Sequence, residues 1–381
     1  MDLELDEQTT AFRDEVRAWL ADNVPKRPLA SFDTAEGFEQ HRRWEAKLAD
    51  ARLSVVSWPR EYGGRDASLL EWVLFEEEYY AAGAPGRVGQ NGIFMLAPTL
   101  FSHGTPEQRE RILPAMARGE QVWAQAWSEP EAGSDIAALR STATRTDGGW
   151  LLSGQKVWSS RATYADRAFG LFRSDPDSER HRGLTYAMFD LRADGVRVRP
   201  IPQLDGEPGF AEIFLDEVFV PDADVIGEPS EGWRVAMTTA NNERGLSLRS
   251  PGRFLAAADR LVRLWRETSG DTGTALAQRV ADAWIQARAY QLYTFGTVTR
   301  LAEGGELGPE SSVNKLFWSQ LDVALHETAL ELLGPDAELS GETGWPEGWL
   351  FSLAGPIYGG TDQIQRNVVA ERLLGLPRGQ R

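Results

Sequence analysis

The chain has 381 residues, of which 42% are hydrophobic and 25% are charged, a composition typical of globular proteins. This length predicts two or three domains. A formal net charge of −17 argues against nucleic acid and anionic membrane surfaces as partners. The chain has no cysteine, which excludes disulfides and thiol chemistry. An acidic start, and the lack of an apolar run of the roughly 20 residues that span a bilayer, predict a soluble, cytoplasmic protein.

Residues 1–120 are predicted to form a helical domain. Apolar residues recur near the start at i, i+4, i+7 and i+8, which is the spacing of a helix with one buried face: Phe12, Val16, Trp19 and Leu20. Further helices are expected over 39–51, 69–82 and 106–113. Thr105 followed by Pro106 predicts the N-cap and first residue of the last of these helices. The acidic run Glu76 to Glu78 has no histidine nearby, so we expect a solvated helix face there.

Residues 121–231 are predicted to form a β-domain. Short runs rich in β-branched and aromatic residues alternate there with glycine-containing turns, which is typical of a sandwich or barrel. The expected strands are 150–152, 156–158, 168–172, 184–191, 196–201 and 212–220. The stretch from Gly149 to Lys156 has nearly the spacing of a phosphate-binding loop. An inserted Gln155, and the absence of a helix pattern after it, favour a hairpin between strands instead.

Residues 232–381 return to helical patterns. The expected helices are 233–243, 254–267, 275–301, 311–333 and 360–373. The chain is thus predicted to be an α+β protein with a helical, a β and a second helical domain in that order. Its four histidines are scattered, so no metal site is expected.

Three motifs suggest chemistry. Residues 125–135 read Gln-Ala-Trp-Ser-Glu-Pro-Glu-Ala-Gly-Ser-Asp, a turn of small residues whose backbone N–H groups suit an anionic ligand. Residues 156–160 read Lys-Val-Trp-Ser-Ser, and residues 357–366 read Ile-Tyr-Gly-Gly-Thr-Asp-Gln-Ile-Gln-Arg. Together these motifs resemble the flavin-binding signatures of the acyl-CoA dehydrogenase family, and the resemblance extends over essentially the whole chain.

The resemblance implies an N-terminal helical domain, a central β-domain and a C-terminal four-helix bundle, assembled as homotetramers or dimers. It implies FAD between the β-domain and the C-terminal helices. The residues that it places against FAD are Gln125, Trp127, Ser128, Ser134, Trp158, Ser159, Ser160, Thr361 and Gln363. Ser134 is also expected where the pantetheine of the thioester passes. For Trp158 taken alone, an ordinary place in the core of a strand is the alternative.

The reaction implied is α,β-dehydrogenation of an acyl-CoA or acyl-carrier thioester. A carboxylate takes the α-proton, flavin N5 accepts the β-hydride, and an electron-transfer flavoprotein receives the electrons. The commonest family base directly follows the tyrosine of the last motif, where this chain has Gly359. One branch of the family instead places its base before an arginine on the first C-terminal helix, a pattern that Glu243-Arg244 matches.

Glu243 is therefore the predicted base, with a structural helix carboxylate as the alternative. The backbone N–H of Gly359 is predicted to hold the thioester carbonyl. Asn241 and Arg244 are candidate substrate contacts, although Arg244 also suits a structural role. The arginine motif that reaches a partner's FAD pyrophosphate is degenerate at Arg266, and Arg279 is an equal candidate.

Three alternatives stay open at this point. The first is a hetero-oligomer with a half-degenerate partner, and the second is a non-catalytic partner subunit, both suggested by the degenerate arginine motif. The third is a flavin monooxygenase or nitroalkane-oxidase-like enzyme on the same scaffold, suggested by Gly359. The acyl group itself is not indicated, because Gly359 permits branched, long or ring-bearing chains without selecting one.

Overall fold

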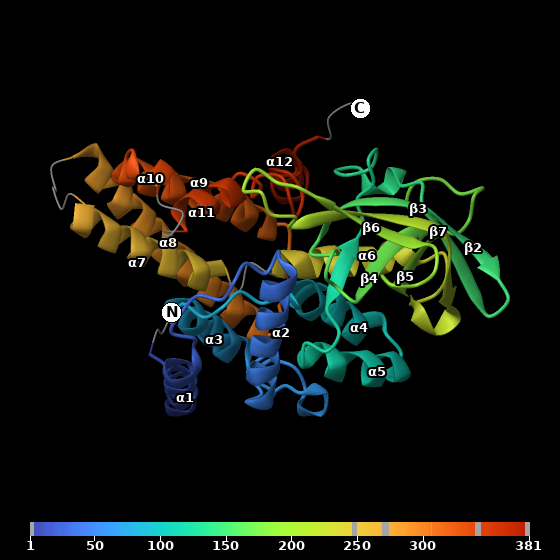
Figure 1. Cartoon of the computed structure of the whole chain (residues 1–381), viewed down its shortest axis with the longest axis horizontal. Coiled ribbons are helices and arrows are strands. Elements are labelled where there is room, and N and C mark those ends of the chain that lie inside the picture. The colour runs from blue at the N-terminus through green and yellow to red at the C-terminus, as the bar shows by residue number, and fades with distance from the viewer. Residues whose placement is uncertain (1–3, 246–249, 269–273, 306, 340–343, 378–381) are drawn as a thin grey trace. The chain divides into compact units, whose positions relative to one another are not determined.

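A computed structural model describes residues 4–245, 250–268, 274–305, 307–339 and 344–377, and for residues 242–245, 250 and 339 it describes the backbone alone. The chain divides into two compact units, which are coloured along the sequence in Figure 1. One unit, here called the β unit, comprises residues 25–66 and 85–243. The other, the helical unit, comprises residues 1–24, 67–84 and 244–381.

The β unit is built around one sheet. In the described chain its strands are β1 (Trp123–Ala126), β2 (Thr142–Thr146), β3 (Gly149–Ser160), β4 (Arg167–Arg173), β5 (Leu184–Asp190), β6 (Val196–Ile201), β7 (Phe210–Pro221) and β8 (Val225–Ile226). They lie in the order β6-β7-β3-β2-β4-β5-β8, and β1 pairs in parallel with β4. The other long pairings are antiparallel, as Figure 1 shows for the green strands.

Helices of the same unit flank the sheet. They are α2 (Ala35–Asp50), a π-helical turn at Gly92–Leu96, α4 (Ala97–His103), α5 (Pro106–Ala117) and α6 (Gly232–Gly245), of which residues 232–243 belong to this unit. Phe38 of α2 belongs to the same buried cluster as Ala143, Leu152 and Ile213 of the sheet. Helix α5 begins with a capping box between Thr105 and Gln108, which confirms the predicted N-cap.

The helical unit contains α1 (Glu7–Asn23), α3 (Leu69–Ala81), α7 (Ser250–Thr268), α8 (Ala275–Ala302), α9 (Ser311–Leu333), α10 (Asp336–Leu339), α11 (Trp345–Ser352) and α12 (Asp362–Val368). Helices α7, α8 and α9 pack side by side (Figure 1). Their core includes Phe254, Leu261, Ala287 and Leu325, all almost fully buried. A π-helical turn at Val369–Leu373 follows α12.

The predicted α+β class, with a helical, a β and a second helical section, is confirmed. Two expectations were wrong. The segments 150–152 and 156–158 belong to one strand, β3, so Gly149 to Lys156 is no hairpin. The run Glu76 to Glu78 is no solvated face, because α1, α7 and α8 pack around α3 and leave Glu76 with no exposed surface.

Candidate active site

The first site segment follows strand β1 of the β unit. Gln125 lies in β1, and Trp127 and Ser128 come directly after its end, all three partly buried. The Val157 N–H donates to the Ser128 carbonyl at 2.8 Å, so this segment is hydrogen-bonded to strand β3. The structure therefore brings the first two sequence motifs together. The pairing of β1 with β4 fixes where the segment leaves the sheet.

A buried ion pair lies beneath these two motifs. Lys156 has no exposed surface, and its Nζ donates to Glu129 Oε1 at 2.9 Å and to the Leu171 carbonyl at 2.8 Å. The Trp127 carbonyl is 3.4 Å from the same nitrogen. Burial opposes ionisation of Glu129, but the charge of Lys156 and the hydrogen bonds that the carboxylate accepts together outweigh it and lower the pKa of this carboxyl. The pair thus ties the Trp127 segment to strand β3.

Glu129 also accepts from two backbone N–H groups, those of Arg140 at 2.6 Å and Ser141 at 2.9 Å. A buried carboxylate with this many donors is satisfied as an anion. Glu129 and Lys156 are not recognisable as a pair from the sequence, because they are 27 residues apart and meet only once the sheet has formed. The sequence signal was an acidic residue, Glu129, in the first flavin motif and a basic residue, Lys156, in the second.

Trp158 lies at an irregularity of strand β3. The register between β3 and β7 shifts between Lys156 and Ser159, and Trp158 has φ +60°. This left-handed backbone is unfavourable for a bulky residue. It leaves the indole 58% exposed, with an edge-on contact to Phe210, so Trp158 is not a core residue of the strand. Strain of this kind is typical of functional sites.

Ser159 and Ser160, the next residues of β3, differ in exposure. Ser159 is fully buried, and within the described residues its hydroxyl has no hydrogen-bond partner. Ser160 is partly buried. The structure thus places Ser160 nearer the surface on the strand that carries Trp158, and Ser159 beneath it.

The turn at Gly133 and Ser134 is open to solvent. Both residues are exposed, and a Cβ built on Gly133 would meet no atom within 4 Å. The neighbouring Asp135 pairs with Arg180 at 2.8 Å. The main chain at Gly133 is therefore accessible to a ligand, as the motif predicted.

The third motif forms a turn of the helical unit. Gly359 and Gly360 have φ +64° and +86°, the region that favours glycine. The buried Gln365 donates from Nε2 to the Gly359 carbonyl at 2.9 Å and to the Gly360 carbonyl at 3.3 Å. In the part of the chain that the structure describes, the N–H groups of Gly359 and Gly360 donate to no acceptor. Within the described chain, the carbonyls of this turn are thus hydrogen-bonded and its N–H groups are unpaired.

A second buried ion pair anchors this turn. Lys315 Nζ of α9 lies 2.9 Å from Asp362 Oδ1, which the Ser319 hydroxyl also approaches at 3.3 Å. Asp362 is the first residue of α12, and Thr361 caps that helix by accepting from the Ile364 N–H. Thr361 therefore has a capping role in addition to its predicted place at FAD. Gln363 is exposed.

A further ion pair lies next to the turn. Arg253 of α7 donates to Asp322 Oδ2 at 2.6 Å and hydrogen-bonds Tyr358, the residue before Gly359. Burial opposes ionisation of Asp322, but the charges and hydrogen bonds of Arg253 and His326 together outweigh it and lower the pKa of this carboxyl. Lys315, Asp362 and Arg253 were not predicted, since their pairing depends on how α7, α9 and α12 pack.

The predicted base lies on α6. Asn241 is exposed, and Glu243 and Arg244 fall in the last turn of that helix. The side chains of Glu243 and Arg244 lie outside the described residues. Residues 125–160 and Glu243 belong to the β unit, and residues 357–366 belong to the helical unit.

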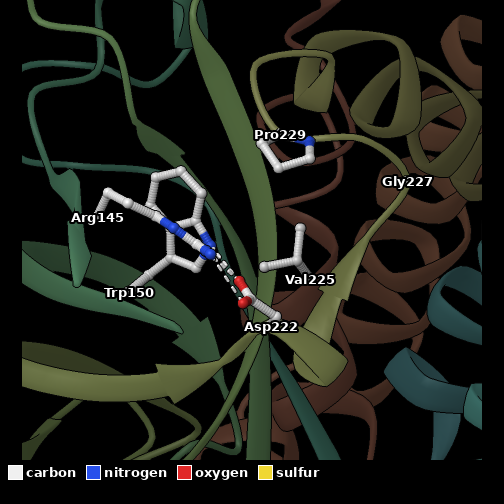
Figure 2. Close-up of a pocket in the computed structure, with 6 residues that line it drawn as sticks. All are labelled: Arg145, Trp150, Asp222, Val225, Gly227 and Pro229. Carbon is white, nitrogen blue, oxygen red and sulfur yellow. Dashed lines mark hydrogen bonds and ion pairs between the residues drawn. The ribbon is translucent and has the colours of Figure 1, made fainter. Parts of the chain in front are cut away.

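One pocket of the β unit lies apart from these motifs. It has a volume of about 500 Å³ and is lined by Arg145, Trp150, Asp222, Val225, Gly227 and Pro229. Figure 2 shows the Arg145 guanidinium against Asp222, which also accepts from the Trp150 indole at 3.1 Å. Because this cation is already paired, the pocket offers no free charge to an anionic ligand.

Three family models match successive parts of the chain. They are the N-terminal domain of acyl-CoA dehydrogenase over residues 6–120, the middle domain over 124–218 and the C-terminal domain over 230–374. The acyl-CoA dehydrogenase IpdE1 of Mycobacterium tuberculosis is 40% identical over 381 residues, covering 96% of this chain and 97% of its own. The chain belongs to the acyl-CoA dehydrogenase family. Members of this family are FAD-dependent oxidoreductases.

Two solved structures and one longer relative add detail. The Tcur3481-Tcur3483 steroid ACAD is 25% identical with a TM-score of 0.86, and the ChsE4-ChsE5 complex from Mycobacterium tuberculosis is 28% identical with a TM-score of 0.83. Each alignment covers 100% of both chains. The acyl-CoA dehydrogenase FadE34 of the same organism is 40% identical over 345 residues, which are 88% of this chain and 46% of FadE34.

The residues at hand fit a flavin dinucleotide. In the β unit, the open backbone at Gly133 and the exposed Trp158 indole are groups that a polar, flat ligand would cover. Among the described residues there is no cluster of metal-binding side chains. No described helix has the length and apolar character that crossing a bilayer requires.

Proposed function

We propose that this chain catalyses FAD-dependent α,β-dehydrogenation of an acyl-CoA or acyl-carrier thioester. The observation that carries the proposal is the turn at Gly359 and Gly360, whose carbonyls are bound by Gln365 while the N–H groups donate to no acceptor among the described residues. A free, fixed N–H is what a thioester carbonyl needs as enolate charge develops on its oxygen. Bound FAD would accept the hydride from the β-carbon.

Glu243 is the proposed base. An α-C–H next to a thioester is weakly acidic, so its removal requires a carboxylate held close to the carbon. Glycine at 359 has no side chain for this role, whereas Glu243 stands in the last turn of α6, before Arg244. The Gly359 N–H would hold the carbonyl oxygen while Glu243 takes the proton. Asn241, which is exposed on the same helix, is proposed to contact the pantetheine.

The FAD contacts are proposed at the three motifs. Gln125, Trp127 and Ser128 would line the flavin edge, and Trp158 with Ser160 would cover the ring. Ser134 would stand where the pantetheine enters, and Thr361 and Gln363 would meet the ribityl-to-adenosine region. The unpartnered hydroxyl of Ser159 lies on the same strand.

For the substrate we propose an acyl thioester that carries a ring system. The support is twofold: Gly359 leaves room where other members carry a glutamate side chain, and one 25%-identical structure is named a steroid ACAD. A panel of thioesters with straight, branched and polycyclic acyl groups should therefore reduce the flavin fastest with the polycyclic member. Equal rates with a straight-chain ester would contradict this choice.

The test of the base is Glu243→Gln. Under anaerobic conditions the wild type should lose its flavin absorbance when mixed with the thioester and form the enoyl product. The variant should do so about 10²–10⁴-fold more slowly, which is the range typical of a lost general base. Glu231→Gln is the matched control, because Glu231 is exposed and immediately precedes α6. Bleaching of the Glu243→Gln variant at the wild-type rate would disprove the assignment.

We further propose that the enzyme assembles with a second, related subunit and passes electrons to an electron-transfer flavoprotein. The two solved structures described above each carry two names, and the chain matches only 46% of FadE34. The chain purified alone should then hold less than one FAD per subunit, and co-expression with the partner should raise this ratio. If the chain purified alone formed an oligomer with one FAD per subunit, a homotetramer or homodimer would be favoured over assembly with a second, related subunit. Oxygen-dependent turnover without a thioester would indicate an oxidase instead.

A further inference from the structure

A continuous chain of side-chain hydrogen bonds crosses the β unit. The Trp127 indole Nε1 lies 3.2 Å from the Tyr186 hydroxyl, which lies 3.1 Å from Thr239 Oγ1. Thr239 Oγ1 lies 2.8 Å from Thr99 Oγ1, which donates to the Met95 carbonyl at 2.7 Å. The chain thus runs from the predicted flavin edge, through β5 and α6, to α4 and the π-helical turn before it.

The protons of this chain all point in one direction. Thr99 uses its one proton on the Met95 carbonyl, so Thr239 must donate to Thr99 and Tyr186 must donate to Thr239. Tyr186 then accepts from the indole N–H, which can only donate. Thr239 has a weaker second acceptor, the Val235 carbonyl at 3.3 Å.

Water does not compete with these bonds. Thr99, Tyr186 and Thr239 each have no exposed surface. Buried hydrogen bonds in a row strengthen one another, and a buried polar group that loses its partner is costly. The arrangement of Trp127, Tyr186 and Thr239 is therefore fixed as a unit and cannot change one bond at a time.

The chain reaches the helix that carries the proposed base. Thr239 precedes Glu243 by four residues, about one helical turn. A second contact joins the same two helices, since His103 Nε2 of α4 lies 2.8 Å from Thr238 Oγ1 of α6. At the other end, Tyr186 stacks on Phe169 of β4, a strand that pairs with β1 just before Trp127.

We propose that Tyr186 and Thr239 are positioning residues that couple the flavin-edge indole of Trp127 to helix α6, so that occupancy of the flavin site fixes the turn carrying Glu243. This inference rests on the proposed roles of Trp127 and Glu243. Neither Tyr186 nor Thr239 is proposed to touch the substrate. A ligand that fixes the orientation of the Trp127 indole also fixes the Tyr186 hydroxyl, which accepts the indole N–H. Tyr186 in turn fixes the hydroxyl of Thr239 on α6.

The coupling is tested by hydrogen–deuterium exchange, with and without FAD, on amides 236–241 of α6 and 95–99 beside it. Tyr186→Phe removes the central hydroxyl, Thr239→Val removes the next one, and Thr239→Ser retains it. Tyr164→Phe is the matched control, because Tyr164 packs on Phe38 and its hydroxyl has no hydrogen bond within the described residues. Affinity for FAD is measured on the same samples.

In the wild type and the controls Thr239→Ser and Tyr164→Phe, FAD should slow exchange at 236–241 by about tenfold or more. Tyr186→Phe and Thr239→Val should bind FAD within about threefold of wild type and lose most of this protection. With substrate, they should lower the rate constant of flavin reduction about tenfold and leave KM nearly unchanged.

Wild-type protection in Tyr186→Phe would overturn the proposal. Equal losses of exchange protection in Thr239→Ser and Thr239→Val would also overturn it. So would variants that lost FAD affinity alone, because either result would show that these residues act through packing and not through their hydroxyl groups. The exchange measurement uses no thioester, so it tests the coupling between Trp127 and α6 even if Glu243 is not the base. Absence of FAD binding by the wild type would instead count against the proposed function.

Discussion

The two units hold their site turns with the same kind of device, a buried lysine bonded to a carboxylate. In the β unit Lys156 and Glu129 lie 2.9 Å apart, and in the helical unit Lys315 and Asp362 lie 2.9 Å apart. The surroundings differ. Glu129 accepts two backbone N–H groups in addition, whereas Asp362 receives its two side-chain donors on one oxygen.

The backbone that each pair supports also differs. The β unit holds a tryptophan, Trp158, in a left-handed conformation, whereas the helical unit uses Gly359 and Gly360 there. A bulky residue at positive φ needs surroundings that over-determine it, and glycine does not. We infer that the Lys156 pair supplies part of this constraint, while the Lys315 pair mainly fixes where α12 begins.

The largest effect is expected from Lys156→Met. It leaves the Glu129 carboxylate buried without its cation, and such a loss typically destabilises a protein by about 3–5 kcal/mol. The free energy of unfolding in urea measures this. Arg145→Met is the control, because the Arg145–Asp222 pair is exposed and should contribute little. If the two variants unfolded at the same urea concentration, the Lys156–Glu129 pair would contribute no more to the free energy of unfolding than the exposed Arg145–Asp222 pair.

Lys315→Met should cost less, about 2–3 kcal/mol, because Asp362 is the first residue of α12 and favourable interaction with the helix N-terminus remains. Its clearer consequence should be about tenfold weaker FAD binding, since the Gly359 turn loses its anchor. Titration of the apoprotein with FAD gives this number. A greater loss of stability than in Lys156→Met would reverse the comparison between the two pairs.

Gly360→Ala tests the need for glycine in the helical unit. The residue has φ +86°, and an added Cβ would lie 2.5 Å from Gln365 Nε2. Gln365 would have to give up its bonds to the turn, so we expect a loss of about 1–3 kcal/mol in stability. Gly133→Ala is the control, since its Cβ would meet open space. Equal melting temperatures for the two variants would show that the turn is less constrained than its contacts indicate.

The sequence predicted local structure better than it predicted the two buried lysine–carboxylate pairs. The helix at 311–333 and the capping of α5 follow from apolar periodicity and from Thr105 and Pro106, which lie close together in the chain. The motif residue Lys156 was visible, but its burial depends on β1, β3 and β4 meeting. The run Glu76 to Glu78 shows the same limit, because part of its burial comes from α7 and α8, more than 170 residues later.

Glu77 extends the comparison to a half-buried carboxylate whose hydrogen-bond partner is Gln291 and not a lysine. Burial raises its pKa to about 7, although Gln291 donates to it at 2.8 Å. A carboxyl with a raised folded-state pKa contributes stability below its unfolded value, near 4.5, and loses it as the pH rises through about 7. Glu129, whose pKa is lowered, behaves in the opposite way and loses its contribution as the pH falls.

Glu77→Gln should therefore be more stable than the wild type at pH 8, by about 1–2 kcal/mol after allowance for solvent screening, and equal to it near pH 5. Urea unfolding at several pH values measures the difference. Glu110→Gln, at an exposed site on α5, should follow the wild-type curve throughout. A difference that stayed constant from pH 5 to 8 would mean that Glu77 is ionised over the whole range. The contrast with Glu129 would then lie in packing alone, because both carboxylates would carry their charge in the folded state.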